Sequence, residues 1–313
     1  MSFQTPVLFL VFNRPDTTIR VFEKIREQKP KRLYIAADGA RAGNVNDARK
    51  CTEVLEIVNG IDWDCEVKTL FRERNLGCKI AVSEAITWFF ENEEMGIILE
   101  DDCLPDATFF PYCAELLHKY KDDEKIAGIS GSNLLNYKPI DGASYFLSKY
   151  VHIWGWASWR RVWKNYDVEM KDWPALRNGN FLKALADGNP YFVGYWKNIF
   201  DKTYGSKIDT WDYQFHFSYL KENMFCCVPK INLVSNIGFD QDATHTFDEN
   251  HPANKLKTKE MAFPIKHISS LERETNFDKS FDKIIFKLNL KNWLIQTLSS
   301  LKKRIIKSHI RTP

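Results

Sequence analysis

The chain has 313 residues, of which 44% are hydrophobic and 27% charged, and its formal net charge is +3. This composition is typical of a soluble globular protein and excludes a disordered or fibrous chain. The seven cysteines include no C-x-x-C pair, so we expect reduced thiols in a cytoplasmic protein, with neither a disulfide scaffold nor a zinc module. No apolar run approaches the roughly 18 residues of a spanning helix, and no basic segment precedes the first one, so we expect neither a membrane span nor a secretory signal.

Strands and helices are expected to alternate through the first 130 residues. Apolar runs bounded by turn residues predict strands at 6–12, 33–37, 96–99 and 126–130, the first of them buried, and a further strand is expected near 66–71. Apolar residues at helical spacing predict a helix between successive strands, the first capped by Asp16 or Thr17. This order predicts an α/β fold of the Rossmann-like kind, with a mostly parallel central sheet and helices on both faces.

Beyond residue 140 the periodicity weakens, and tryptophan, glycine and asparagine become frequent. The chain shows no repeat and no low-complexity linker. We therefore expect the second half to extend the same sheet and to close over the site formed by the first half.

The end of the chain carries the positive charge. Residues 279–313 contain nine Lys or Arg and one acid, so this tail carries 9 − 1 = +8 and the remainder 3 − 8 = −5. Apolar residues alternate with lysines at helical spacing, which predicts a basic amphipathic helix over 281–310. Such a helix fits an anionic membrane surface; the alternative is a terminal helix packed on the domain with a solvated lysine face. Because the excess is confined to one end, no nucleic-acid partner is expected.

Three consecutive acidic residues, Glu100, Asp101 and Asp102, follow the apolar run 96–99. Open α/β sheets bind ligands at the carboxyl ends of their strands. Carboxylates gathered there repel one another unless a cation accepts them, and Mg²⁺ or Mn²⁺ prefers oxygen ligands and bridges to phosphates. The tripeptide therefore predicts a metal–diphosphate site; the alternative is an acidic turn in which Asp102 or Asp106 caps the next helix.

Further candidate residues also follow predicted strands. The chain lacks the glycine-rich motifs of P-loop and dinucleotide-binding proteins, and it lacks G-x-S-x-G and H-E-x-x-H. We expect four groups of strand-end residues to share one cleft: Asn13 with Arg14, Asp38, Arg72 with Asn75, and the acidic tripeptide. The arginines would pair with phosphate or balance the carboxylates, and Asp38 would accept from a base N–H or a ribose hydroxyl. Taken singly, each is equally a cap or turn residue.

These segments occur in an order that resembles a known family. The segments Val11–Pro15, Ala37–Gly39, Arg72–Gly77 and Glu100–Asp102 look like those of a GT-A glycosyltransferase. Within that fold the chain is most similar to N-acetylglucosaminyltransferase I-like and family 2-like nucleotide-diphospho-sugar transferases. The resemblance continues through Trp154-Gly155-Trp156, Trp211-Asp212 and Asn236 to Phe239, and covers about residues 5–250.

The resemblance implies a domain organisation and has two departures. It implies a GT-A domain over 1–278, with a donor half of about 1–130 and an acceptor half of about 131–278, followed by the basic tail 279–313. Tyr213 follows Asp212 where relatives can carry a second aspartate. The residues after about 250 have no recognised counterpart.

The resemblance also implies roles for the acidic residues. Asp102 would ligate Mn²⁺ or Mg²⁺ bound to the diphosphate of a nucleotide-sugar, a UDP-sugar by the family's habit. Asp101 would hold ribose or a metal-bound water, and Glu100 the hydroxyls of the donor sugar. Asp212 would take the proton of the acceptor hydroxyl, which implies inversion. The alternative for Asp212 is a helix N-terminal residue stabilised by the helix dipole.

The second half supplies two more candidate elements. Trp154 and Trp156 offer flat apolar faces to a pyranose, and Gly155 lets the backbone come close; a core aromatic cluster is the competing interpretation. A later polar loop resembles one that orders over the diphosphate, with Thr244 touching phosphate or His245 touching metal. A lone histidine is more often structural.

The sequence thus predicts a metal-dependent, inverting glycosyltransferase that moves a sugar from a nucleotide-diphosphate donor to a glycan or lipid-linked acceptor. We expect it in the cytoplasm, peripheral on the inner membrane face. One alternative is a sugar-nucleotide pyrophosphorylase, which shares the fold and the metal but usually carries a glycine-rich loop with a basic residue after the first strand. The other is a carbohydrate- or membrane-binding module without catalysis.

Overall fold

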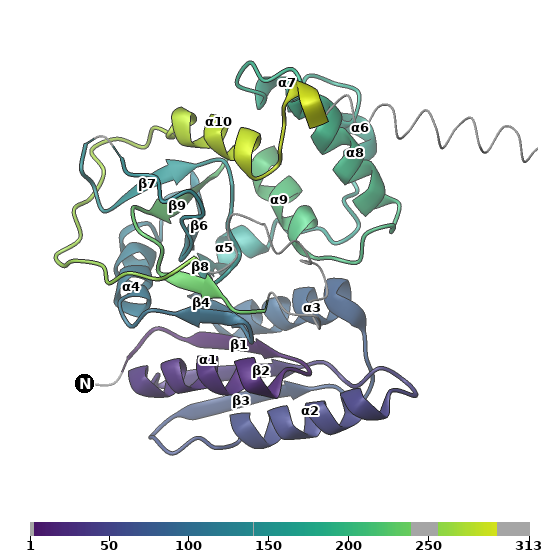
Figure 1. Cartoon of the computed structure of the whole chain (residues 1–313), viewed down its shortest axis with the longest axis vertical. Helices are drawn as coiled ribbons and strands as arrows, with labels where there is room; N and C mark the ends of the chain where they lie inside the picture. The colour runs from purple at the N-terminus through teal and green to yellow at the C-terminus, as the bar shows by residue number, and fades with distance from the viewer. Residues whose placement is uncertain (1–2, 140, 239–255, 293–313) are drawn as a thin grey trace, which may run out of the picture.

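A central sheet with helices on both faces forms the body of the protein (Figure 1). The computed structural model describes residues 3–139, 141–238 and 256–292. The strands are β1 Val7–Val11, β2 Arg32–Ala37, β3 Glu66–Phe71, β4 Met95–Glu100, β5 Cys103–Pro105, β6 Ile126–Ser130, β7 Tyr145–Ser148, β8 Trp156–Trp159, β9 Phe225–Pro229 and β10 Val234–Asn236. The helices are α1 Pro15–Gln28, α2 Val45–Val58, α3 Gly77–Asn92, α4 Phe109–Lys119, α5 Arg160–Trp163, α6 Trp173–Leu176, α7 Phe181–Ala184, α8 Phe192–Tyr204, α9 Asp212–Lys221 and α10 Thr275–Ile284.

The main sheet has eight strands in the order β3-β2-β1-β4-β8-β6-β9-β7, and β5 pairs with β10 in a separate two-stranded sheet. Strands β1 to β4 are mutually parallel. Strand β8 runs antiparallel to β4 and β6, β9 is parallel to β6, and β7 is antiparallel to β9. Six strands therefore run one way and two, β7 and β8, run the other. The predicted α/β fold with a mostly parallel sheet is confirmed.

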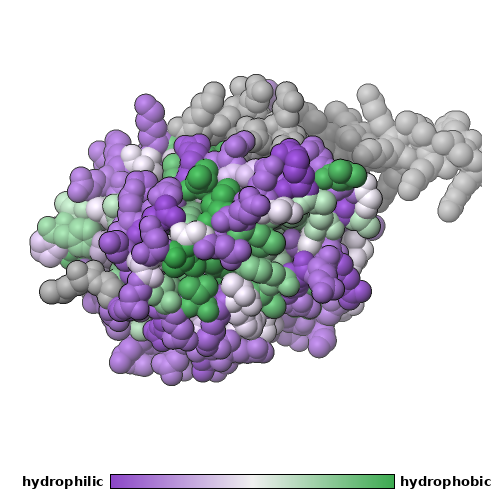
Figure 2. Space-filling view, turned by 90° about the horizontal axis from the view of Figure 1, so that it is seen from below, coloured by the Kyte–Doolittle hydropathy of each residue, from purple (hydrophilic) through white to green (hydrophobic). Residues whose placement is uncertain are grey.

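The position of each strand follows from its side chains. All five residues of β1 are apolar and buried, as expected of a parallel strand covered on both faces. Strand β3 has one neighbour and ends the sheet, and its Val67 and Phe71 are exposed. Figure 2 shows the molecule from the end where α2 and β3 lie, with hydrophilic residues surrounding a hydrophobic strip.

The helices of the first half cover both faces of the sheet. Helices α1 and α2 lie side by side on one face and α3 lies on the other (Figure 1). Helix α1 begins at Pro15, whose fixed φ and missing N–H suit a first helical turn. Arg14 is the N-cap residue and makes no side-chain capping bond, so the prediction that Asp16 or Thr17 caps this helix is wrong. Asp16 lies in the first turn, where the helix dipole favours a carboxylate.

The second half extends the sheet, as predicted, and packs its helices around an aromatic core. The rings of Trp156 and Trp211 stack at 5.7 Å, and Phe215 lies 5.1 Å from Trp156. All three side chains are at most 1% exposed. This cluster fixes the start of α9 against β8.

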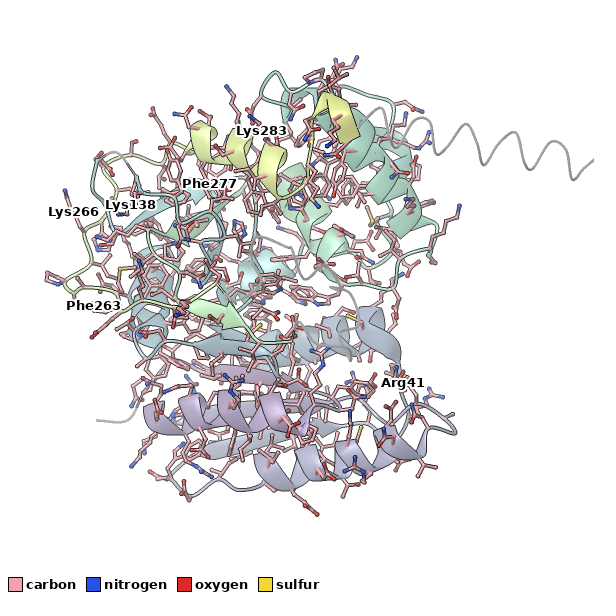
Figure 3. All side chains as sticks on the ribbon, viewed as in Figure 1. Arg41, Lys138, Phe263, Lys266, Phe277 and Lys283 are labelled. Atoms are coloured by element: carbon pink, nitrogen blue, oxygen red, sulfur yellow. The ribbon has the colours of Figure 1, made fainter. Side chains whose placement is uncertain are left out.

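Helix α10 packs on the second half of the sheet through its inner side. Phe277 and Phe281 are buried, and Lys283 is exposed and points away from the body (Figure 3). The intervening Asp278 is also fully buried, where it accepts from Ser148 Oγ at 2.6 Å and from Arg273 at 2.9 Å. The helix is therefore held by apolar burial and by ion pairing together.

The predicted helix over 281–310 is wrong in its start and its continuity. Helix α10 begins at Thr275 and ends at Ile284, so the boundary expected after residue 278 falls inside it. Residues 285–289 are not helical, and Lys287 among them has a left-handed φ of 54°. In the described chain no helix is both long and apolar enough to cross a bilayer. Residues 293–313, with the rest of the basic tail, lie outside the described residues.

Candidate active site

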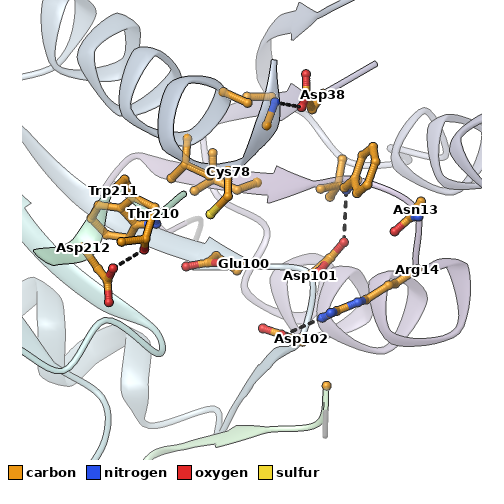
Figure 4. Close-up of a pocket in the computed structure, with 18 of the residues that line it drawn as sticks. Asn13, Arg14, Asp38, Cys78, Glu100, Asp101, Asp102, Thr210, Trp211 and Asp212 are labelled. Atoms are coloured by element: carbon orange, nitrogen blue, oxygen red, sulfur yellow. Dashed lines mark hydrogen bonds and ion pairs between the residues drawn. The ribbon is translucent and has the colours of Figure 1, made fainter. Parts of the chain in front are cut away.

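A pocket of about 540 Å³ opens at the carboxyl ends of β1, β2 and β4. The first turns of α3 and α9 and the segment before β8 bound it from the other side (Figure 4). Both halves of the chain therefore build it. Ten residues predicted from the sequence line this pocket: Asn13, Arg14, Asp38, Arg72, Asn75, Glu100, Asp101, Asp102, Trp154 and Asp212.

The acidic tripeptide lies at the end of β4, where Glu100 is the last strand residue. The Phe12 backbone N–H donates to Asp101 Oδ2 at 3.0 Å, and Arg14 Nη1 donates to Asp102 Oδ2 at 2.8 Å. Burial, then the charges of Asp102 and Asp101, raises the pKa of Glu100 well above its ordinary value. Burial, then the charge of Asp102, raises the pKa of Asp101 to about 7. The protein thus gathers three acidic side chains at one strand end, with Arg14 as the adjoining cation.

Asp38 follows β2 and fixes the loop that leads into α3. Its carboxylate accepts from the backbone N–H groups of Gly39, Leu76 and Gly77 and from the amide of Asn75, at 2.9–3.1 Å. Burial raises the pKa of Asp38, against the effect of these donors. Four N–H donors meet the acceptor capacity of a carboxylate. Asp38 therefore holds this loop, and its expected role of accepting from a base N–H or a ribose hydroxyl stays a prediction.

Arg72 follows β3 and lines the pocket from the neighbouring strand end. Its guanidinium donates to Glu84 Oε2 on α3 at 2.9 Å, and its side chain is 12% exposed. This ion pair connects the end of β3 to α3 beside the pocket.

Two residues near Asn13 were missed by sequence reasoning. Asp47, buried in the first turn of α2, accepts from Asn13 Nδ2 and Arg41 Nη2, both at 2.9 Å, and also from Arg41 Nε. The hydrogen bonds from Arg41 are the main cause that lowers the pKa of Asp47. Arg41 lines the pocket, with its guanidinium 5.7 Å from the centre of the Phe12 ring. An acid in a first helical turn is common, so nothing in the sequence distinguishes Asp47 from a dipole-stabilising residue.

Asp212 opens α9 on the far side of the pocket from Arg14 (Figure 4). It accepts a hydrogen bond from Thr210 Oγ1. The buried Trp211 anchors this turn in the aromatic core. The charge of Asp212 also contributes to the raised pKa of Glu100, and both side chains line the same pocket.

The predicted sugar-binding segment is divided between the pocket and the core. Trp154 lines the pocket, whereas Gly155 and Trp156 are not among the residues that line it. Trp156 is 1% exposed and stacks on Trp211, so it is a core residue. Gly155 has φ +64°, and a Cβ there would lie 2.7 Å from Val234. The expectation for these two residues is corrected: glycine at 155 serves packing against β10, and Trp156 serves the core.

Cys78 and Asp209 line the pocket as well and were not expected. Asp209 Oδ1 accepts from the Lys79 backbone N–H at 3.1 Å, and a Cβ on Gly77 would lie 2.9 Å from Asp209 Oδ2. Burial, and then the charge of Glu100, raises the pKa of Cys78, so it remains a protonated thiol. No sequence pattern connects residue 209 with the start of α3, and only the fold brings them together.

Among the described residues, few protein oxygen donors are available to hold a divalent ion in this pocket. The part of the chain that the structure describes contains no group of three or more His, Cys, Asp or Glu placed to hold a metal. Mg²⁺ is usually bound by one or two carboxylates together with substrate phosphates. Asp102 lies beside the buried Asp101 and the half-buried Glu100. This arrangement fits an ion that arrives with a diphosphate, and it does not form a closed protein cage. Thr244 and His245, expected at phosphate or metal, lie outside the described residues.

Comparisons with known proteins give no family for the chain. No family model matches it, and no curated protein matches its sequence. The solved structures with partial likeness include HddC from Yersinia pseudotuberculosis, with 12% identity, 52% of this chain and 80% of that chain covered, and a TM-score of 0.32. They also include a UDP-glucose pyrophosphorylase complexed with UDP-glucose, with 10% identity, coverages of 46% and 62% and a TM-score of 0.27. Mouse xyloside xylosyltransferase 1 in its apo form has 9% identity, coverages of 72% and 84% and a TM-score of 0.32. Likeness of this size carries no argument about activity, which must come from the pocket.

Proposed function

We propose that the protein is a metal-dependent, inverting GT-A glycosyltransferase that uses a nucleotide-diphosphate sugar, with a UDP-sugar as the first donor to test. One observation carries the proposal: the acidic tripeptide at the end of β4 and Asp212 at the start of α9 line the same pocket, although they come from different halves of the chain. Glycosyl transfer needs an electrophilic site for the leaving diphosphate and a separate base for the acceptor.

The strand-end side supplies the donor site. Asp102 is the residue that would hold Mn²⁺ or Mg²⁺, and when bound this ion neutralises the charge that develops on the leaving diphosphate. Arg14 and Arg72 line this side and carry the positive charge that a diphosphate attracts. Glu100, the last residue of β4, would accept from hydroxyls of the donor sugar.

The α9 side supplies the acceptor site. Asp212 would take the proton of the attacking hydroxyl, and its hydrogen bond from Thr210 orients the carboxylate. A base on the face opposite the leaving group produces inversion at the sugar carbon. Trp154 lines the pocket and offers an aromatic face to a glycan or lipid-linked acceptor.

Release of UDP from a panel of UDP-sugars, with and without Mn²⁺, tests this proposal. We expect turnover that requires the metal and is lost in Asp102→Ala. Asp106→Asn is the matched control, because Asp106 accepts from the Thr108 N–H just before α4 and is not among the residues that line the pocket. Pyrophosphate-dependent nucleotide formation would show a sugar-nucleotide pyrophosphorylase instead. Sugar or nucleotide binding without turnover of any donor would show a binding module.

We also propose that the basic tail rests on an anionic membrane surface and so brings the protein to the inner membrane face. Lys283, Lys287 and Lys291 are exposed. Phe281 and Leu288 are buried, so a truncation that tests the tail should begin after residue 292. We expect the chain 1–292 to keep its turnover and to lose binding to vesicles containing phosphatidylserine. Equal vesicle binding by both chains would refute this part of the proposal.

A further inference from the structure

Arg14 occupies the position next to the acidic tripeptide where a metal ion would bind. Its Nη1 lies 2.8 Å from Asp102 Oδ2, and the two side chains are 15% and 16% exposed. The other carboxylate oxygen, Oδ1, accepts from the Cys103 thiol at 3.4 Å. Both oxygens of the carboxylate assigned to the metal are therefore already in contact with donors of this chain.

The end of β10 closes over the same ion pair. The Ile237 N–H donates to the Asp102 carbonyl oxygen at 2.8 Å. A Cβ on Gly238 would lie 2.4 Å from Asp102 Oδ2 and 2.7 Å from Arg14 Nη1, so the Gly238 backbone passes directly against the pair. A Mg²⁺ ion holds its oxygen ligands at about 2.1 Å and needs room for several of them. The Arg14 guanidinium stands in that room at Asp102 Oδ2, and the Gly238 backbone passes beside it.

We infer that Arg14 is the resident counter-cation of Asp102, and that a divalent ion gains this carboxylate only when a diphosphate draws Arg14 away. The inference rests on the proposed function and makes Arg14 a positioning residue. Guanidinium groups bind phosphate oxygens in bidentate pairs, so a diphosphate gives Arg14 a new partner. The same diphosphate supplies oxygen ligands to the metal. Metal and diphosphate therefore bind with positive coupling, and each raises the affinity for the other by the same factor.

The two other pocket arginines differ from Arg14 in their partners. Arg72 pairs with Glu84 on α3, and Arg41 pairs with Asp47 on α2. Arg72→Gln therefore removes one positive charge from the same pocket and leaves the pair at Asp102 in place. It is the matched control for Arg14→Gln.

Mn²⁺ binding to the full-length protein, followed by the electron paramagnetic resonance signal of free Mn²⁺, tests the inference without turnover. We expect UDP to tighten Mn²⁺ binding to the wild type at least tenfold. In Arg14→Gln we expect Mn²⁺ alone to bind at least tenfold more tightly than to the wild type, which corresponds to about 1.4 kcal/mol. UDP should then increase the Mn²⁺ affinity of the variant by a smaller factor than it does in the wild type. Arg72→Gln should keep the wild-type affinity for Mn²⁺ alone.

Unchanged or weaker Mn²⁺ binding by a folded Arg14→Gln protein, checked by circular dichroism, would overturn the inference. Arg14→Met carries the same expectation if the glutamine variant does not fold. Failure of the proposed function gives a different result: no UDP-sugar is turned over, while the exchange between Arg14 and Mn²⁺ at Asp102 is still measured.

Discussion

The two halves of the chain place their buried charges differently. In the first half, Asp101 and Asp102 lie at a strand end and line the pocket beside Arg14. In the second half, Lys149 and Asp278 are 2% and 0% exposed and lie away from it. Burial alone therefore does not mark the site.

What differs is the balance of charge around the buried groups. The described lining of the pocket has three arginines, Arg14, Arg41 and Arg72, against six acids, Asp38, Glu100, Asp101, Asp102, Asp209 and Asp212. In the second half, Lys149 and Arg273 each meet Asp187 within 2.8 Å, and Arg273 also meets Asp278. Two cations against three acids, with Asp282 as the third, attach α10 to the sheet there, whereas the larger surplus of acid in the pocket calls for a ligand of opposite charge.

The largest expected effect comes from Asp212→Asn, which tests the pocket as a catalytic site. The amide cannot take the acceptor's proton, so we expect transfer to fall about 10³-fold, within the usual range for losing a general base. Transfer should be measured with the donor found in the UDP-sugar panel, and UDP affinity should stay at the wild-type value. A rate within about threefold of wild type would exclude Asp212 as the base.

Asp278→Ala tests the charge network of the second half. It leaves Arg273 without one buried partner, and removal of one partner of a buried ion pair costs roughly 3–5 kcal/mol. We expect urea unfolding to show a loss of about 3 kcal/mol, with UDP affinity unchanged in the folded protein. Asp172→Ala breaks an exposed pair with Lys221 and should cost less than about 1 kcal/mol. Equal losses in the two variants would contradict the distinction between the halves.

Gly155→Ala tests the seam where β8 and β10 meet beside the pocket. Gly155 has φ +64° with Val234 against it, whereas Gly188 has φ +80° and nothing within 4 Å of the added Cβ. We expect Gly188→Ala to cost about 1 kcal/mol from backbone strain and Gly155→Ala about 2 kcal/mol because overpacking adds to it. Thermal unfolding measures both. A smaller cost at 155 than at 188 would show that β10 moves aside freely.

The smallest effect, taken over a single pH unit, concerns the buried His152. Burial lowers the pKa of His152 to about 3, from an ordinary value of 6.5. Between pH 6.5 and 3, His152 is therefore protonated in the unfolded chain and neutral in the folded chain. The free energy of unfolding falls as the pH drops through this range. His152→Leu removes this contribution, so its unfolding free energy should fall less steeply, by up to about 1.4 kcal/mol per pH unit. Parallel profiles for variant and wild type would show that this histidine is not buried in its neutral form.

The sequence by itself determined the strands of the first half and their order. The predicted strands at 66–71 and 126–130 coincide with β3 and β6. Strands covered on both faces, such as β6, were readable because they leave continuous apolar runs, and the helices between strands leave a period of about 3.6 residues. The same logic marked strand-end residues such as Arg14 and Asp102 as neighbours before any contact was known, since parallel strands end at one edge.

Only the tertiary structure decided which partner each polar group has. Asp38 and Asp101 are both acids that follow a strand. Asp38 accepts from four N–H donors of the protein, whereas Asp101 lies next to the charge of Asp102, which raises its pKa. Trp154 and Trp156 are two residues apart, yet Trp154 lines the pocket and Trp156 is buried in the core. The periodicity of the sequence indicates how deeply a residue is buried. It does not identify the residue's neighbours, because these come from segments distant in the chain. The hydrogen-bond geometry is fixed only when those segments pack together.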